Sequence, residues 1–183
     1  MNSKKILRVL IVTALLLLVP LGAMQFSREV NWGPFDFVIA GVLLSGTGLL
    51  YEFMASRVSG NLWHQLAVAL GVGTGLLLIW VNLAVGLIGS ENNPANLMYL
   101  GVIAIALVGA IVGRFESRGL ARAMAAAAVT QALVGAITAI AGFSSGIELT
   151  RTSLANVFFI VLWAGSALLF RNASATAKTA QGS

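Results

Sequence analysis

The chain has 183 residues, of which 58% are hydrophobic and only 9% are charged, and its mean hydropathy is +0.94. A soluble domain carries roughly 25% charged residues, so this composition excludes a soluble globular fold and also excludes disorder, which needs the opposite composition. The net charge of +5 comes from single basic residues near the ends of apolar segments, without a basic stripe or interleaved aromatics, which argues against nucleic acid as a partner.

Six apolar segments follow one another, and each approaches the length of about 20 residues that a membrane-spanning helix needs. No alternating pattern of barrel strands is visible, so all six are predicted to be helices. The sequence therefore predicts an all-α fold, an integral membrane bundle of six transmembrane helices in one domain over 1–171. The residues 172–183 are small and polar and predict a flexible cytoplasmic tail. The predicted spans are 6–24, 37–56, 62–83, 97–115, 123–143 and 154–170.

The first segment has two interpretations. Basic residues precede an apolar run that begins at Val9, as in a secretory signal peptide. The tripeptide 21–23 (Leu-Gly-Ala) is a poor cleavage site, because leucine stands where a small residue is needed. We therefore expect the first helix to be retained.

The distribution of basic residues predicts that both termini lie in the cytoplasm. Alternating spans then place nine basic residues on the inner side and two, Arg28 and Arg151, on the outer side, which is the bias of the positive-inside rule. Tyr99 is expected at the outer interface. The nine inner residues are Lys4, Lys5, Arg8, Arg57, Arg114, Arg118, Arg122, Arg171 and Lys178.

Small residues mark the middle of the second and third spans, at 45–48 (Ser-Gly-Thr-Gly) and 71–75 (Gly-Val-Gly-Thr-Gly). When the hairpin is folded about residues 59–60, the two patches fall at the same depth and are predicted to pack against each other, because small residues let helix backbones approach closely in lipid. A selectivity filter would need a re-entrant loop, whereas 71–75 lies inside a full-length span.

Three polar residues are expected near the membrane midplane: Thr47, Thr74 and Gln131, the last in an alanine-rich span that should lie inside the bundle. Hydrogen bonding between helices is one interpretation of these residues. The other is a small polar site of the kind in which transporters bind substrate.

No ionisable residue lies near the middle of a span, which argues against proton-coupled or ion-coupled transport. Folding of the hairpin instead predicts a cluster at the cytoplasmic mouth, formed by Glu52, Arg57, His64 and Arg114. We interpret this cluster as a set of satisfied ion pairs at the interface, with a cytoplasmic gate as the alternative.

The loop 89–96 is the most distinctive polar stretch of the sequence. Gly89 can end one helix, Pro94 can begin the next, and Asn96 or Asn93 can cap it. The same loop could instead offer oxygen ligands to a cation or a sugar, although one carboxylate is too few for tight calcium binding. The residues of that candidate outer-loop site are Glu91, Asn92 and Asn93.

Two sets of residues recur at regular spacing, which indicates either helix ends of the same kind or a duplicated hairpin. The members of the first set are interpreted as N-caps, and those of the second as cations anchored at the interface. Asp36, Asn96 and Asn156 are spaced by 60 residues, and Arg57, Arg114 and Arg171 by 57.

Catalysis has little support in the sequence. There is no cysteine and only one histidine, His64, so disulfides, thiolate chemistry and cysteine-based metal sites are excluded. No nucleophile–histidine–acid set or phosphate loop is present. We therefore predict no cofactor, no metal and no enzymatic activity.

Residues 30–44 (beginning Val-Asn-Trp-Gly-Pro) and 89–99 (beginning Gly-Ser-Glu-Asn-Asn-Pro) resemble stretches of a family of small uncharacterised bacterial multi-pass membrane proteins. The resemblance implies a bacterial inner-membrane location and carries no catalytic or binding residues. The leading hypothesis is a non-catalytic accessory or partner-binding subunit that contacts the lipid bilayer and either itself, as a homo-oligomer, or another membrane protein. The alternative is a small transporter or channel that uses the midplane residues.

Overall fold

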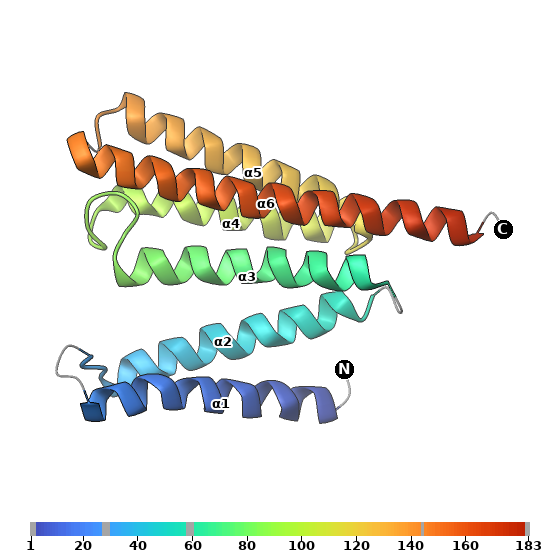
Figure 1. Ribbon diagram of the computed structural model, residues 1–183, viewed down its shortest axis with the longest axis horizontal. Coiled ribbons are helices and arrows are strands. Elements are labelled where there is room, and N and C mark those ends of the chain that lie inside the picture. The colour runs from blue at the N-terminus through green and yellow to red at the C-terminus, as the bar shows by residue number, and fades with distance from the viewer. Residues whose placement is uncertain (1–2, 27–29, 58–60, 144, 182–183) are drawn as a thin grey trace. The chain divides into compact units, whose positions relative to one another are not determined.

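The computed structural model describes residues 3–26, 30–57, 61–143 and 145–181, and six long helices make up most of these residues (Figure 1). Within the described ranges, six helices are long and apolar enough to cross a membrane. The predicted all-α class with six candidate spans is therefore confirmed. Contacts divide the chain into two compact units, Met1–Ser56 and Arg57–Ser183. The single six-helix domain expected over 1–171 stays a prediction.

The first unit is a helical hairpin formed by α1 (Ser3–Phe26) and α2 (Pro34–Ala55). A proline opens α2, where its missing N–H costs no hydrogen bond. The Asp36 carboxylate accepts a hydrogen bond of 2.7 Å from the backbone N–H of Gly33, the residue that precedes the helix. The predicted N-cap role of Asp36 is wrong, because α2 begins two residues earlier, at Pro34, with Gly33 as its N-cap. Asp36 instead stabilises the start of α2 from inside the first turn.

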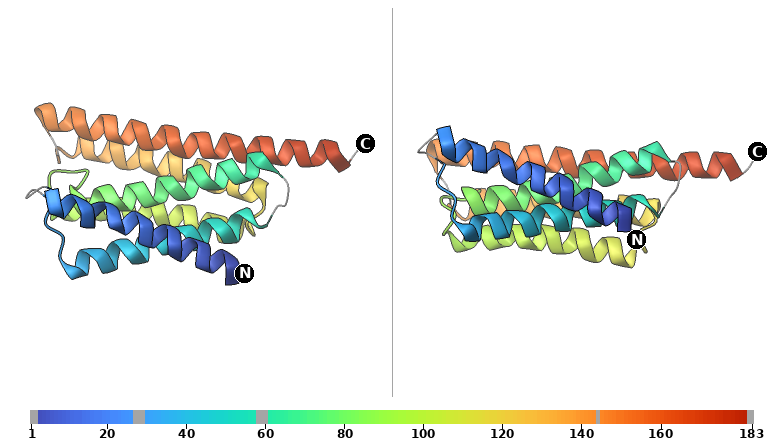
Figure 2. Two further views of the ribbon diagram at one scale, coloured as in Figure 1. Left: turned by 60° about the horizontal axis from the view of Figure 1, so that its bottom comes forward. Right: turned by 90° about the horizontal axis from the view of Figure 1, so that it is seen from below.

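The second unit contains four long helices that lie side by side (Figures 1 and 2). The α5 helix packs against α6, α3 packs against α6, and α4 packs against α5, whereas α3 and α4 contact each other only slightly. The elements are α3 (Leu62–Ala84), the 3-10 turn η1 (Pro94–Leu97), α4 (Met98–Val112), α5 (Ser117–Ile140) and α6 (Gly146–Gln181).

Two helices, α5 and α6, begin well before the predicted spans. The α5 helix begins at Ser117 instead of 123, and α6 extends from Gly146 to Gln181 instead of from 154 to 170. The charged residues near these ends predict loops, but a helix that extends beyond the hydrocarbon core can carry charge, because its exposed side chains reach water. The segment 172–181, expected as a flexible tail, continues α6, and its alanines favour a helix.

Small residues bring the helices of each unit into close contact. In the second unit, a Cβ built on Gly71 would lie 2.8 Å from Ser166 Oγ of α6, and one on Gly109 would lie 2.7 Å from the Ala123 Cβ of α5. In the first unit, a Cβ on Gly48 would lie 2.7 Å from a methyl group of Val9. The predicted packing of the patches 45–48 and 71–75 against each other concerns two separate units and stays a prediction.

The two ends of the second unit differ in charge. The end at which α3 begins, α4 turns into α5 and α6 leaves the bundle is called the arginine end, and the opposite end, with the segments 85–97 and 141–145, is called the loop end. At the loop end the described charged residues are Glu91, Glu148 and Arg151. The arginine end holds one acid, Glu116, and the residues Arg57, Arg114, Arg118, Arg122 and Arg171.

Candidate functional site

A buried amide, Asn156 of α6, connects three helices of the second unit. Its Oδ1 atom accepts a hydrogen bond of 2.9 Å from Gln131 Nε2 of α5, and its Nδ2 donates one of 3.0 Å to the Tyr99 hydroxyl of α4. The same Nδ2 donates to the Thr152 carbonyl at 2.9 Å. Gln131 is fully buried, and Asn156 and Tyr99 are 3% and 1% exposed. We call Tyr99, Gln131 and Asn156 the amide network.

The surrounding backbone explains how so many polar groups fit between helices. Gly135 of α5 faces Asn156, and a Cβ built there would lie 3.2 Å from the Asn156 side chain. One turn before Asn156, the Thr152 hydroxyl donates a hydrogen bond of 2.8 Å to the Leu87 carbonyl, which attaches α6 to the segment that follows α3. A glycine and a short threonine therefore make room for the amide network.

Three buried side-chain atoms have no hydrogen-bond partner among the described residues: Gln131 Oε1, Trp163 Nε1 and Asn82 Oδ1. Asn82 lines a cavity of about 60 Å³ between α3 and α4, together with Asn96 and Tyr99. A cavity of this size has room for water. Because an unpaired buried polar atom is costly, a small polar molecule in this cavity would be stabilised by the Asn82 side chain.

The structure places the three predicted midplane residues in different surroundings. Gln131 belongs to the amide network, whereas the buried Thr74 donates a hydrogen bond of 2.6 Å to the Leu70 carbonyl of its own helix. Thr47 is half-buried and belongs to the first unit. Hydrogen bonds therefore connect Gln131 to Asn156 and, through Asn156, to Tyr99. A shared site of Thr47, Thr74 and Gln131 stays a prediction.

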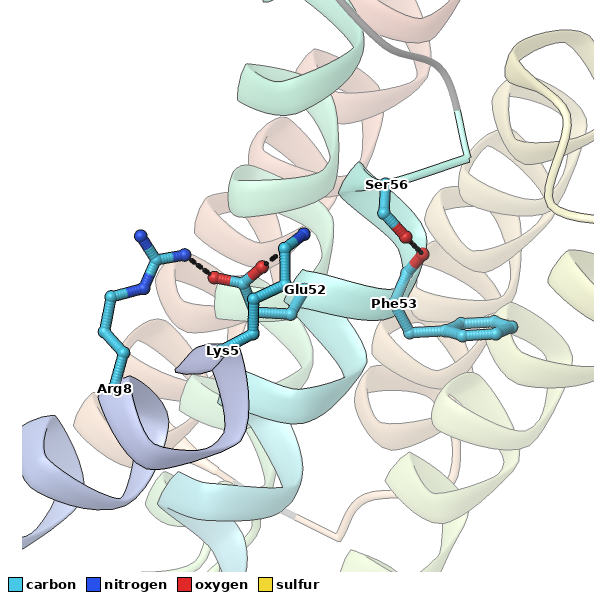
Figure 3. A network of polar contacts seen from close by, with 5 residues as sticks. All are labelled: Lys5, Arg8, Glu52, Phe53 and Ser56. Atoms are coloured by element: carbon cyan, nitrogen blue, oxygen red, sulfur yellow. Dashed lines mark hydrogen bonds and ion pairs between the residues drawn. The ribbon is translucent and has the colours of Figure 1, made fainter. Parts of the chain in front are cut away.

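Glu52 of α2 has basic partners on α1, as Figure 3 shows. Its carboxylate pairs with the Lys5 ammonium group at 3.0 Å and with the Arg8 guanidinium group, which donates a hydrogen bond to it. Glu52 is 6% exposed. The buried acid of the first unit is therefore neutralised by two cations of the first helix, which sequence analysis had not paired with it.

The other members of the predicted mouth cluster belong to the second unit. His64 is fully buried, its Nδ1 lies 3.0 Å from Ser117 Oγ, and its ring meets that of Phe170 edge-on at 5.4 Å. The Arg57 guanidinium carbon lies 5.7 Å from the centre of the Phe115 ring, within the range of a cation–π interaction. His64 thus packs between α5 and α6.

Arg114 is exposed, in the turn between α4 and α5. Its φ of 52° is in the left-handed region, as is that of Phe115 at 57°. These two residues make the tight reversal from α4 to α5. The cluster of Glu52, Arg57, His64 and Arg114 involves both units, so its assembly stays a prediction.

The outer loop is organised by asparagines. The Asn93 side chain accepts a hydrogen bond of 3.0 Å from Ala95 N and caps η1, which confirms one of the two predicted caps. Asn96 has another role, because its buried amide accepts from Leu87 N and Ile88 N at 3.0 and 2.9 Å and donates to the Ser90 carbonyl at 2.7 Å. Asn96 therefore holds the loop closed on itself.

The exposed Glu91 and Asn92 form a hydrogen bond of 3.1 Å with each other. The oxygen-rich site proposed for Glu91, Asn92 and Asn93 stays a prediction, because Asn93 Oδ1 is engaged with the backbone of η1. Arg28, which was counted on the outer side, lies outside the described residues. Across the ranges 3–26, 30–57, 61–143 and 145–181, no three His, Asp or Glu side chains gather as a metal site would require.

Sequence analysis missed two members of the amide network. Asn156 was interpreted as an N-cap, and that interpretation is wrong because α6 begins ten residues earlier, at Gly146, and leaves Asn156 inside the helix. Tyr99 was expected at the membrane interface but is buried, since its hydroxyl bonds to Asn156. A polar residue within an apolar helical run, which singled out Gln131, was the signal that could have identified Asn156.

Together, six apolar helices and a buried polar interior define an all-α, multi-pass membrane protein. The chain matches no protein-family model, no curated protein and no solved structure.

Proposed function

We propose that this protein is a non-catalytic subunit of the inner membrane of a bacterium, where it binds itself or another membrane protein. Both termini lie in the cytoplasm in this proposal. The arginine end of the second unit supports the orientation, because it carries five of the unit's described arginines whereas the loop end carries Arg151 alone. The location in a bacterial inner membrane is the expectation that follows from the sequence of residues 30–44 and 89–99.

The observation that carries the proposed role is that buried polar groups form hydrogen bonds between helices of the second unit. The amide network joins α4, α5 and α6 through mutual hydrogen bonds, the Ser166 hydroxyl of α6 donates to the Ala67 carbonyl of α3 at 2.9 Å, and the Thr152 hydroxyl binds the Leu87 carbonyl. These hydrogen bonds hold the helices of the second unit together. Such an interior suits a rigid scaffold that offers its outer faces to a partner.

Purification of the tagged full chain in a mild detergent tests this proposal. The expected result is a complex of fixed stoichiometry, with a second copy or with one other membrane protein, measured by light scattering and mass spectrometry. The same preparation in a harsh detergent is the control and should yield the monomer. A clean monomer in the mild detergent would contradict the proposed role.

A small transporter or channel is the second candidate, and one observation favours it. The Oε1 atom of the fully buried Gln131 has no hydrogen-bond partner in the described part of the chain, so a polar solute could bind it. Under this candidate, Gln131→Leu abolishes solute flux into vesicles while the protein remains folded. Thr130→Val is the matched control, because the Thr130 hydroxyl bonds within its own helix to the Ala126 carbonyl. Unchanged flux in Gln131→Leu would eliminate this candidate.

A further inference from the structure

A groove runs between α5 and α6 at the arginine end of the second unit. Its volume is about 510 Å³, within the range of about 300–1,000 Å³ that is common for ligand sites. Arg118 and Arg122 of α5 and Arg171 and Ser174 of α6 line its outer part. Five alanines and Leu168 line the rest of the groove, so it is cationic at one end and apolar along its length.

The dimensions of the groove match one leaflet of a bilayer. On α5 the lining residues extend from Arg118 to Ala128, and ten residues of helix rise by about 15 Å. That length is about half of the roughly 30 Å hydrocarbon core. On α6 the lining extends over the equal interval from Ser174 back to Ala164. The whole groove, with its arginines, is therefore about as long as one leaflet of the hydrocarbon core is thick, and its apolar lining on α5 extends from Ala121 to Ala128.

In the described part of the chain, the three arginines that line the groove have no carboxylate partner. The ion pairs of the described residues belong to Glu52, and none joins a carboxylate to Arg118, Arg122 or Arg171. Arg118 and Arg122 lie one turn apart in the first two turns of α5, a helix whose N-terminus has no side-chain cap. The positive charges of Arg118 and Arg122 therefore lie close to each other and to the positive end of the helix dipole of α5. A bound anion would relieve the repulsion.

We propose that the groove binds an anionic phospholipid. Its phosphate is held by the guanidinium groups of Arg118, Arg122 and Arg171, which can each form two parallel hydrogen bonds to phosphate oxygens. One acyl chain lies on the alanine floor, where small side chains leave the space that the groove occupies. Basic pockets between transmembrane helices bind anionic headgroups in this manner. The inference depends neither on the proposed function nor on the orientation of the chain.

Lipid titration of the full chain in mild detergent tests this site. Dioleoyl phosphatidylglycerol should remain bound in native mass spectrometry and raise the melting temperature, and dioleoyl phosphatidylcholine should do neither. Replacing Arg118 and Arg171 with glutamine should weaken phosphatidylglycerol binding about fivefold for each arginine removed. Arg114→Gln is the matched control, because Arg114 is at the same end but does not line the groove.

A second variant tests the apolar part without changing charge. Ala125→Phe fills the groove and should weaken phosphatidylglycerol binding, whereas Ala132→Phe, at an exposed position of α5 outside the groove, should not. Equal binding of the two lipids, or equal loss in Arg114→Gln, would overturn the proposal. So would stabilisation by inorganic phosphate alone, which would indicate a free-anion site. Circular dichroism verifies that each variant is folded. If the arginine variants do not fold, the binding of phosphatidylglycerol to Ala125→Phe tests the site instead.

Discussion

Asn156 of α6 bonds to side chains of two other helices of the second unit. Its amide bonds to both Gln131 and Tyr99, and all three side chains are buried. In lipid, a hydrogen bond between helices contributes about 0.6 kcal/mol on average. Loss of a shared partner costs more, because the remaining groups stay buried without bonds.

Asn156→Leu should therefore lower the free energy of unfolding by about 1–3 kcal/mol, since it leaves both Gln131 and Tyr99 without their partner. Tyr99→Phe should cost only about 0.6 kcal/mol, because the remaining bonds of Asn156 to Gln131 and to the Thr152 carbonyl survive. Denaturant unfolding in mixed micelles, followed by circular dichroism, measures both values. Equal losses in the two variants would show that Asn156 is not the centre of the network.

Among the helices, type and number could be predicted from the sequence, and pairing could not. Apolar length decides whether a helix crosses a membrane, and that property is local to each segment. The partner of a helix depends on which faces meet, as when Gly71 and Ser166 bring α3 against α6. Gln131 was identified because a lone amide in an alanine-rich span is visible in the sequence. The groove between α5 and α6 could not be identified in this way, because the residues that line it are divided between two helices.

The contact between α3 and α6 gives a second prediction. Gly71→Ala should destabilise the protein by about 1–3 kcal/mol, because the new methyl group would force Ser166 to move and weaken its hydrogen bond to the Ala67 carbonyl. Gly101→Ala is the matched control, since a Cβ there meets nothing within 4 Å and the position is exposed. Melting temperatures in detergent compare the two variants. A Gly71→Ala protein as stable as Gly101→Ala would show that the close approach is not needed.

For the chain as a whole, the opposed charges at the two ends of the second unit allow a direct test of the proposed orientation. The sequence contains no cysteine, so a single introduced thiol reports its own side of the membrane. Ser90→Cys, at the exposed loop end, should react with a membrane-impermeant maleimide in intact bacterial spheroplasts. Glu116→Cys, at the arginine end, should react only after permeabilisation. The unsubstituted chain is the control and should remain unlabelled, and the reverse pattern would contradict the orientation.

The length of α6 has a practical consequence for experiments. Its 36 residues extend over about 54 Å, whereas a bilayer with its headgroups is about 40–45 Å thick. At the outer end of the groove, Ala173 is buried, and its carbonyl accepts a hydrogen bond of 2.9 Å from Asn61 Nδ2. Beyond Ser174 the helix continues past the other helices of the second unit (Figure 1). The C-terminal part of α6 therefore separates whatever follows it from the bilayer. A fluorescent protein or an affinity tag fused directly after Gln181 should therefore be held away from the lipid surface without an added linker.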